Sequence, residues 1–144
     1  MKDEEYKAWE HEMETIRAEN KILLDEFEIW LKGKNLKSKT INSHISNIDF
    51  YINGFLLHYD TVKAEDGATS IGWFLGDYFI RKACWSSKYT IKENIASLKK
   101  FYSFMTEIGK TSKENLTEMM DIIKEESEDW ITAVETYLDN LDRL

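Results

Sequence analysis

Apolar residues recur every three or four positions along most of the chain, which is the spacing of one face of an α-helix. The first such stretch runs to residue 30, and Gly33 behind it predicts a helix stop. Its apolar seam consists of Tyr6, Trp9, Met13, Ile16, Leu23, Phe27 and Trp30, with Asn20 as the one polar member. We therefore expect one long helix at the start of the chain.

The middle of the chain predicts a second helix and then a loop. Ser38 is expected to cap the second helix. The polar stretch 60–69 is the best loop in the sequence. The apolar stripe of the second helix consists of Ile41, Ile45, Ile48, Ile52, Phe55 and Tyr59.

Two further helices are expected behind the loop. The third is short and covers residues 71–79, where Gly72 and Gly76 would allow a neighbouring element to approach closely. The fourth follows the tight connection at 84–87, with Ser86 or Ser87 as its N-cap, and ends near Gly109.

The last apolar seam begins after Ser112 and repeats the alternation of the first. It predicts either one helix or two helices broken near Ser127. Its members are Leu116, Met120, Ile123, Ser127, Trp130, Val134, Tyr137 and Leu141. No stretch predicts a strand, so the expected fold is all-α.

The expected architecture is a compact bundle of four core helices with acidic terminal helices packed together. Residues 1–144 form one domain in this interpretation, with a core at 20–110 and extensions at 1–19 and 111–144. Laid antiparallel, the first and last seams bring Asn20 opposite Ser127, within one chain or across a dimer. The open alternative is that each terminal helix covers the core separately.

A parallel pairing of two first helices is disfavoured, because acidic residues would face each other across the seam. These residues are Glu5, Glu12, Glu19 and Glu26.

Composition narrows the classes of protein. The chain has 144 residues, of which 42% are hydrophobic and 13% aromatic, so a folded core is expected rather than disorder. No apolar run approaches the roughly 20 residues of a membrane span, and the acidic first residues do not form a signal peptide. The single cysteine, Cys84, cannot form an internal disulfide, which favours the cytoplasm.

Charge is unevenly distributed around a formal net charge of −8. Residues 1–31 hold four basic and ten acidic side chains, and residues 113–144 hold three and ten. The middle, residues 32–112, holds twelve basic and seven acidic side chains. A basic middle between acidic ends has a local face suited to an anionic partner, whatever the total charge.

Residues 20–110 resemble the core-binding, SAM-like N-terminal domain of tyrosine recombinases (phage integrases). The resemblance rests on SKTINSHISNIDFYINGFL for the second helix and SSKYTIKENIASLKKFYSFMTEIGK for the fourth. It implies a four-helix domain that clamps one side of a DNA duplex through the N-terminal parts of these two helices. The candidate nucleic-acid-binding residues it implies are Lys37, Ser38, Lys39, Thr40, Asn42, Ser43, Asn47, Ser86, Ser87, Lys88, Tyr89, Thr90, Lys92, Lys99 and Lys100.

Residue chemistry agrees with part of this expectation. Helix N-termini with Ser or Thr caps suit phosphate, and Lys88, Lys92 and Lys99 share a helical stripe. Residues 81–100 hold six basic side chains, including Arg81, against Glu93 alone. The alternative is that the serines are ordinary helix caps and the lysines a solvated face. The aromatic residues of 101–104 are expected in the core.

No catalytic site is expected, and neither a cofactor nor a metal. The recombinase family performs its chemistry in a second domain, and we do not expect this chain to contain one. HEMET at 11–15 lacks the second histidine of a zinc-binding helix. His44 and His58 lack ligand-type partners, and Cys84 is expected to be a buried thiol beside Trp85.

Three functional hypotheses follow. The first is a stand-alone, non-catalytic module for double-stranded DNA, an accessory or remnant of a mobile element. The second is a module that kept the fold, lost DNA binding, and uses its terminal helices for a homodimer or a basic protein partner. The third is an acidic mimic of nucleic acid. None of them involves a membrane.

Overall fold

The computed structural model describes residues 2–143, and every regular element in this range is helical. The prediction of an all-α protein is confirmed. The chain divides into two compact units inside the predicted loop, with unit 1 ending at Ala64 and unit 2 beginning at Glu65. The expectation of a single domain with a core at 20–110 depends on how the units join, and it stays a prediction.

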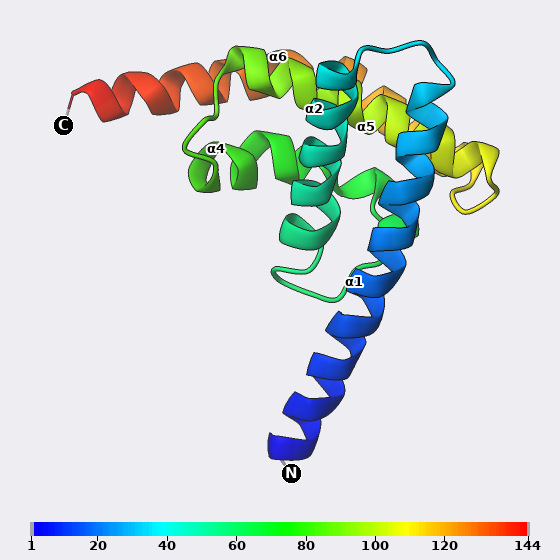
Figure 1. Cartoon of the computed structure of the whole chain (residues 1–144). Coiled ribbons are helices and arrows are strands. Elements are labelled where there is room, and N and C mark those ends of the chain that lie inside the picture. Colours follow the sequence, from blue (N-terminus) through cyan, green and yellow to red (C-terminus); the bar gives the residue numbers. More distant parts are fainter. Residues whose placement is uncertain (1, 144) are drawn as a thin grey trace. The chain divides into compact units, whose positions relative to one another are not determined.

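Unit 1 contains α1 (Lys2–Lys32), α2 (Ser38–Asp49) and the π-helical segment η1 (Phe50–Phe55), which continues α2 (Figure 1). α1 packs against α2 and η1. Each buried large apolar side chain contributes roughly 1.5–3 kcal/mol. Those of unit 1 include Leu23, Phe27, Leu31, Ile41, Ile48, Tyr51, Ile52 and Phe55. The predicted stripe is confirmed except at Ile45, which is half-buried, and Tyr59, which is exposed.

The turn between α1 and α2 uses a residue that the sequence pattern does not single out. α1 ends at Lys32, just before Gly33 as expected. However, Asn35 takes the left-handed backbone conformation, with φ of 60°, and Gly33 does not. Asparagine is one of the few residues that tolerate this conformation. Lys34 places its Nζ 4.7 Å from the centre of the Trp30 ring.

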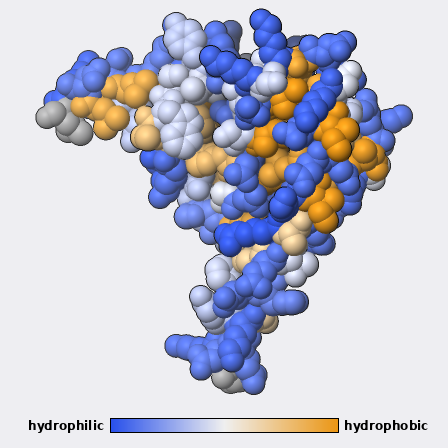
Figure 2. All heavy atoms as spheres, viewed as in Figure 1, coloured by the Kyte–Doolittle hydropathy of each residue, from blue (hydrophilic) through white to orange (hydrophobic). Residues whose placement is uncertain are grey.

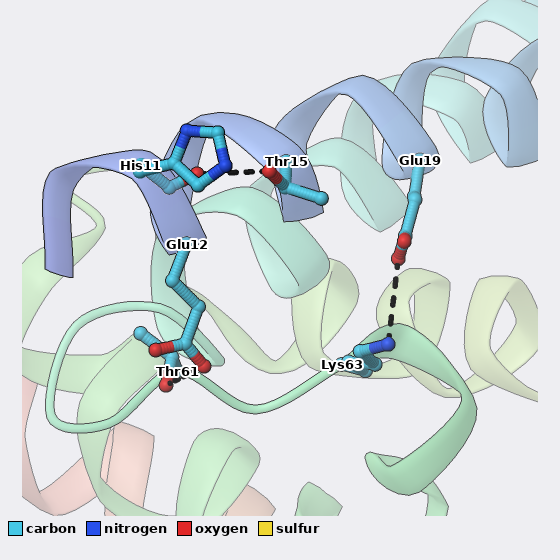
Figure 3. A network of polar contacts seen from close by, with 6 residues as sticks. All are labelled: His11, Glu12, Thr15, Glu19, Thr61 and Lys63. Atoms are coloured by element: carbon cyan, nitrogen blue, oxygen red, sulfur yellow. Dashed lines mark hydrogen bonds and ion pairs between the residues drawn. The ribbon is translucent and has the colours of Figure 1, made fainter. Parts of the chain in front are cut away.

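Two side chains of α1 hold the segment that follows η1 (Figure 3). Thr61 Oγ1 donates a hydrogen bond of 2.8 Å to Glu12 Oε1. Lys63 Nζ lies 3.9 Å from Glu19 Oε2. These contacts fix the end of unit 1 against its longest helix.

The polar seam residue Asn20 has partners inside unit 1. It is 1% exposed, and its Nδ2 donates to Asn53 Oδ1 at 2.8 Å and to the Ile52 carbonyl at 3.4 Å. Asn53 in turn donates to Asp49 Oδ1 at 2.6 Å. From Met13 onward the seam of α1 therefore covers its own unit. Pairing of Asn20 with Ser127 would join the two units and stays a prediction.

Unit 2 begins with short helical turns and then one mixed helix. The first turn, η2 (Ala64–Asp66), starts at the last residue of unit 1, and η3 (Ala68–Ser70) follows it. The helix consists of α3 (Ile71–Trp73), the π-helical η4 (Phe74–Tyr78) and α4 (Phe79–Lys82). It is the predicted third helix, extended at its end.

The long helices α5 (Lys88–Glu107) and α6 (Lys113–Asp142) complete unit 2. They pack on each other, and α6 also covers η3, α3 and η4. α6 is one helix, which decides between the two possibilities at Ser127. Gly109 ends the α5 region with φ of 77°. The buried residues of α6 are Met119, Ile123, Trp130 and Val134.

The close approach expected at Gly72 and Gly76 is confirmed. A Cβ at Gly72 would lie 3.2 Å from Glu126 Oε1. A Cβ at Gly76 would lie 3.1 Å from Trp130 Cδ1, and the Trp130 side chain is 2% exposed. These glycines let α6 lie directly on the α3–η4 segment.

Candidate nucleic-acid interface

The start of α2 carries backbone N–H groups that no side chain caps. Its N-cap is Lys37 (φ −69°, ψ 149°), which makes no side-chain capping bond, so the prediction that Ser38 is the cap is wrong. Ser38 lies inside the first turn, and Lys37 contributes only its carbonyl, which accepts from Ile41 N at 3.0 Å. The first N–H groups of a helix have no partner within the helix and carry partial positive charge. This end therefore suits an anion.

The remaining candidates on α2 divide by exposure. Lys39, Asn42 and Ser43 are exposed, on the side away from buried Ile41 and Ile48. The Ser43 hydroxyl donates to the Lys39 carbonyl at 3.1 Å. Thr40 is also exposed, whereas Asn47 is half-buried. The first turn contains no acidic residue.

Side chains of α5 and of its N-cap residue cap the backbone N–H groups at the start of the helix. Ser87 is the N-cap, which confirms one of the two expected positions. Its Oγ accepts from Thr90 N at 3.2 Å, and its own N–H donates to Thr90 Oγ1 at 2.8 Å. This capping box satisfies two N–H groups that a phosphate would otherwise use. Ser87 and Thr90 are thus occupied by helix capping.

Ser86 is buried, unlike most of the other candidates. Its side chain is 7% exposed and donates to the Ile80 carbonyl at 3.2 Å. A phosphate could reach this hydroxyl only if the connection between α4 and α5 opened. In this structure the serine fixes the connection, and a phosphate contact at Ser86 stays a prediction.

Lysines on the exposed side of α5 form the strongest basic feature of unit 2. Lys88, Lys92 and Lys99 are exposed and Lys100 is half-buried; we name these four the α5 stripe. The Lys88 Nζ lies 5.2 Å from the centre of the Tyr89 ring, which is 67% exposed. The ion pairs within residues 2–143 use Lys21, Lys32, Lys63 and Arg81, so no α5-stripe lysine takes part in one.

Arg81 contributes less to this basic region than its charge suggests. Its Nε and Nη2 donate to the two carboxylate oxygens of Asp77 at 3.0 and 2.8 Å. The hydrogen bonds from Arg81 lower the pKa of the Asp77 carboxyl below its usual value, against a smaller opposing effect of burial. The charge of Arg81 is therefore largely balanced within its own helix.

The connection before α5 carries two exposed side chains, Cys84 and Trp85. Cys84 is exposed, so the prediction of a buried thiol is wrong. Trp85 is 51% exposed and makes a T-shaped contact with Phe79, with ring centres 6.3 Å apart. Phe101, Tyr102 and Phe104 are buried in the core as predicted.

Residues 2–143 contain no group of three or more His, Cys, Asp or Glu side chains placed to hold a metal ion. Over the same range, no helix has the length and apolar character needed to cross a membrane.

The candidates form two groups in separate units. The α2 group lies in unit 1 and the α5 group in unit 2. Whether both groups face one duplex depends on the arrangement of the units, so the clamp stays a prediction. Sequence reasoning missed the role of Lys37 as N-cap, because lysine has no side-chain acceptor and no local pattern marks it as a cap.

The comparisons with protein-family models, with curated proteins and with solved structures each find no match to this chain. The resemblance to recombinase core-binding domains therefore rests on the residues quoted above.

Proposed function

We propose that this chain is a non-catalytic module that binds double-stranded DNA through phosphate contacts. The contacts come from the start of α2 and from the α5 stripe, in line with the family resemblance. The observation that carries the proposal is the start of α2. It combines uncapped N–H groups, exposed Lys37 and Lys39, and a first turn free of acidic residues.

The α5 stripe supplies further positive charge, but the N-terminus of α5 supplies few free N–H donors. The capping box occupies Ser87 and Thr90, so binding at α5 relies on lysine side chains rather than on the helix end. Lysines provide point charges without the two-pronged geometry that reads guanine. We therefore expect binding with little sequence preference and a strong dependence on salt.

A labelled duplex titrated with the full chain tests this proposal by fluorescence anisotropy at about 50 and about 200 mM salt. Four phosphate contacts would weaken binding by roughly 100-fold across that range. The variant Lys88→Glu/Lys92→Glu should bind more weakly and reduce the salt slope by about 2. Lys37→Glu/Lys39→Glu should do the same if the start of α2 takes part.

The matched control is Lys110→Glu/Lys124→Glu, which makes the same change of charge at exposed lysines outside both groups. Equal losses in all three variants would point to a general charge effect and contradict the proposed contacts. No binding by the wild-type chain at the lower salt would contradict DNA binding altogether. The hypothesis of a protein-interaction module would then take its place.

A further inference from the structure

The first turns of α1 form a helix whose residues are all exposed. Every residue from 2 to 12 is exposed, and the first buried side chain of α1 is Met13. We name residues 2–12 the exposed arm. At 1.5 Å per residue it is about 16 Å of helix, and it extends beyond η1 within unit 1 (Figure 1). In the space-filling view this end of α1 is mostly hydrophilic, with paler spheres among the blue (Figure 2).

An aromatic pair on the exposed arm continues the buried seam of α1. Tyr6 and Trp9 are 59% and 47% exposed, with ring centres 5.7 Å apart. They precede Met13 and Ile16 at the same three-four spacing, and those two are buried with Leu57. Aromatic side chains bury roughly 150–250 Å² each when they are covered. The seam is therefore apolar beyond the point where its own unit covers it.

Acidic residues flank this exposed seam on both sides. With Tyr6 and Trp9 at the a and d positions of a heptad, the e and g positions are Asp3, Glu5, Glu10 and Glu12. All four are exposed. The e and g positions set the choice of partner in helix pairs through charge. A partner that suits this arm carries Lys or Arg at the facing positions.

The same flanks argue against a second copy of the arm as the partner. A parallel pair places e against g, and an antiparallel pair places e against e and g against g. Every one of these arrangements sets carboxylate against carboxylate. Like charges at such positions destabilise helix pairing.

We propose that the exposed arm docks an amphipathic helix of a different protein, one with an apolar seam flanked by Lys or Arg. Tyr6 and Trp9 would pack on its seam, and the carboxylates of Asp3, Glu5 and Glu10 would face its basic flanks. Glu12 accepts from Thr61 Oγ1 and marks the inner end of the site. The arm shares no residue with the candidate nucleic-acid interface, so this site stands independently of the proposed DNA binding.

The test uses three labelled designed peptides and the full chain, followed by fluorescence anisotropy. The first peptide has a leucine seam flanked by lysine, the second has the same seam flanked by glutamate, and the third is a scrambled version of the first. The lysine-flanked peptide should bind at least about tenfold more tightly than either of the others. Equal affinity for the lysine-flanked and scrambled peptides would overturn the proposal.

Variants of the exposed arm show whether the peptide binds there. Trp9→Ser should weaken binding of the lysine-flanked peptide about tenfold or more, because a buried Trp dominates such contacts. Ile22→Ser, an exposed apolar residue of α1 off the seam, is the matched control and should leave binding unchanged. Glu5→Lys/Glu10→Lys should shift the preference to the glutamate-flanked peptide. Circular dichroism checks that each variant keeps its helices.

Two results would contradict the proposed partner. Unchanged affinity in Trp9→Ser would place the peptide elsewhere on the acidic surface. A wild-type dimer in sedimentation analysis that Trp9→Ser dissociates would show that a second copy covers the seam. A monomer at working concentration is the expected result.

Discussion

The helices α2 and α5 begin with similar residues but satisfy their first backbone N–H groups differently. In both, a threonine lies three residues after the N-cap, Thr40 in α2 and Thr90 in α5. Only α5 has a serine as N-cap, and Ser87 completes a capping box with Thr90. The N-cap of α2 is Lys37, whose ammonium group cannot accept a hydrogen bond.

The difference shows that a motif shared by two helix starts does not give them the same chemistry. The start of α5 is used for stability, and its first turn offers few free donors. The start of α2 gives up roughly 0.5–2 kcal/mol of capping free energy and keeps its donors available. Elsewhere in unit 2, α6 packs directly on α3 and η4.

The largest effect is expected where unit 2 is most closely packed. Gly76→Ala should lower the free energy of unfolding by about 1–3 kcal/mol, because its Cβ would meet the buried Trp130 ring at 3.1 Å. Thermal unfolding followed by circular dichroism measures this change. In unit 1, Gly54→Ala is the control, since its Cβ would lie 3.8 Å from Phe50 and alanine favours the helix by up to about 1 kcal/mol.

Removing the side-chain cap of α5 should have the next largest effect on stability. Ser87→Ala removes the hydroxyl that accepts from Thr90 N, and we expect a loss of about 1 kcal/mol in the free energy of unfolding. Urea unfolding measures this loss. Ser38→Ala is the control, and it should change stability little because Ser38 does not cap α2. Equal losses in both variants would contradict the conclusion that a serine side chain caps α5 but not α2.

Adding a side-chain cap to α2 should have a smaller effect on stability, of opposite sign. Lys37→Ser places an acceptor three residues before Thr40 and should raise the free energy of unfolding by about 0.5–1 kcal/mol. The variant should also bind duplex DNA more weakly, because it loses a cation and occupies an N–H donor. Lys37→Gln, which loses the cation without becoming a good cap, separates the two causes. A stabilised variant with unchanged DNA binding would exclude the start of α2 as a contact.

The smallest effect concerns the ion pair of Asp77 with Arg81. The pKa of Asp77 is lowered in the folded chain, so its contribution is present above the unfolded pKa and is lost as the pH falls through the folded pKa. The two side chains are 48% and 42% exposed, so solvent limits this contribution to a few tenths of a kcal/mol. Urea unfolding between pH 7 and pH 3 measures it. Asp77→Asn should remove this part of the pH dependence.

Much of the helical framework follows from the sequence, because spacing, caps and stops are local properties. The fourth helix, its cap at Ser87 and its end near Gly109 agree with expectation. The two π-helical segments η1 and η4 do not follow from any local signal. A π turn shifts the side chains behind it, and whether this shift is favourable depends on the surface packed against it.

The candidate interface follows from the sequence only in part. The exposed lysines of α5 agree with a stripe read from helical spacing. The burial of Ser86 and the exposure of Cys84 do not follow from spacing, because they depend on how the connection between α4 and α5 folds back on Ile80. A polar residue in a tight connection has two uses, an internal hydrogen bond or an external contact, and only the local packing selects between them.

The sequence by itself determined the all-α class, the long first helix, the basic middle between acidic ends and the close approach of a neighbour at Gly72 and Gly76. Each of these depends on residue type and spacing, which short-range sterics and charge translate directly into structure. The tertiary structure decided which helix start stays uncapped, which seam residues find partners and where the aromatic seam of α1 becomes exposed. These outcomes depend on where the neighbouring helices end, and no local pattern contains that information.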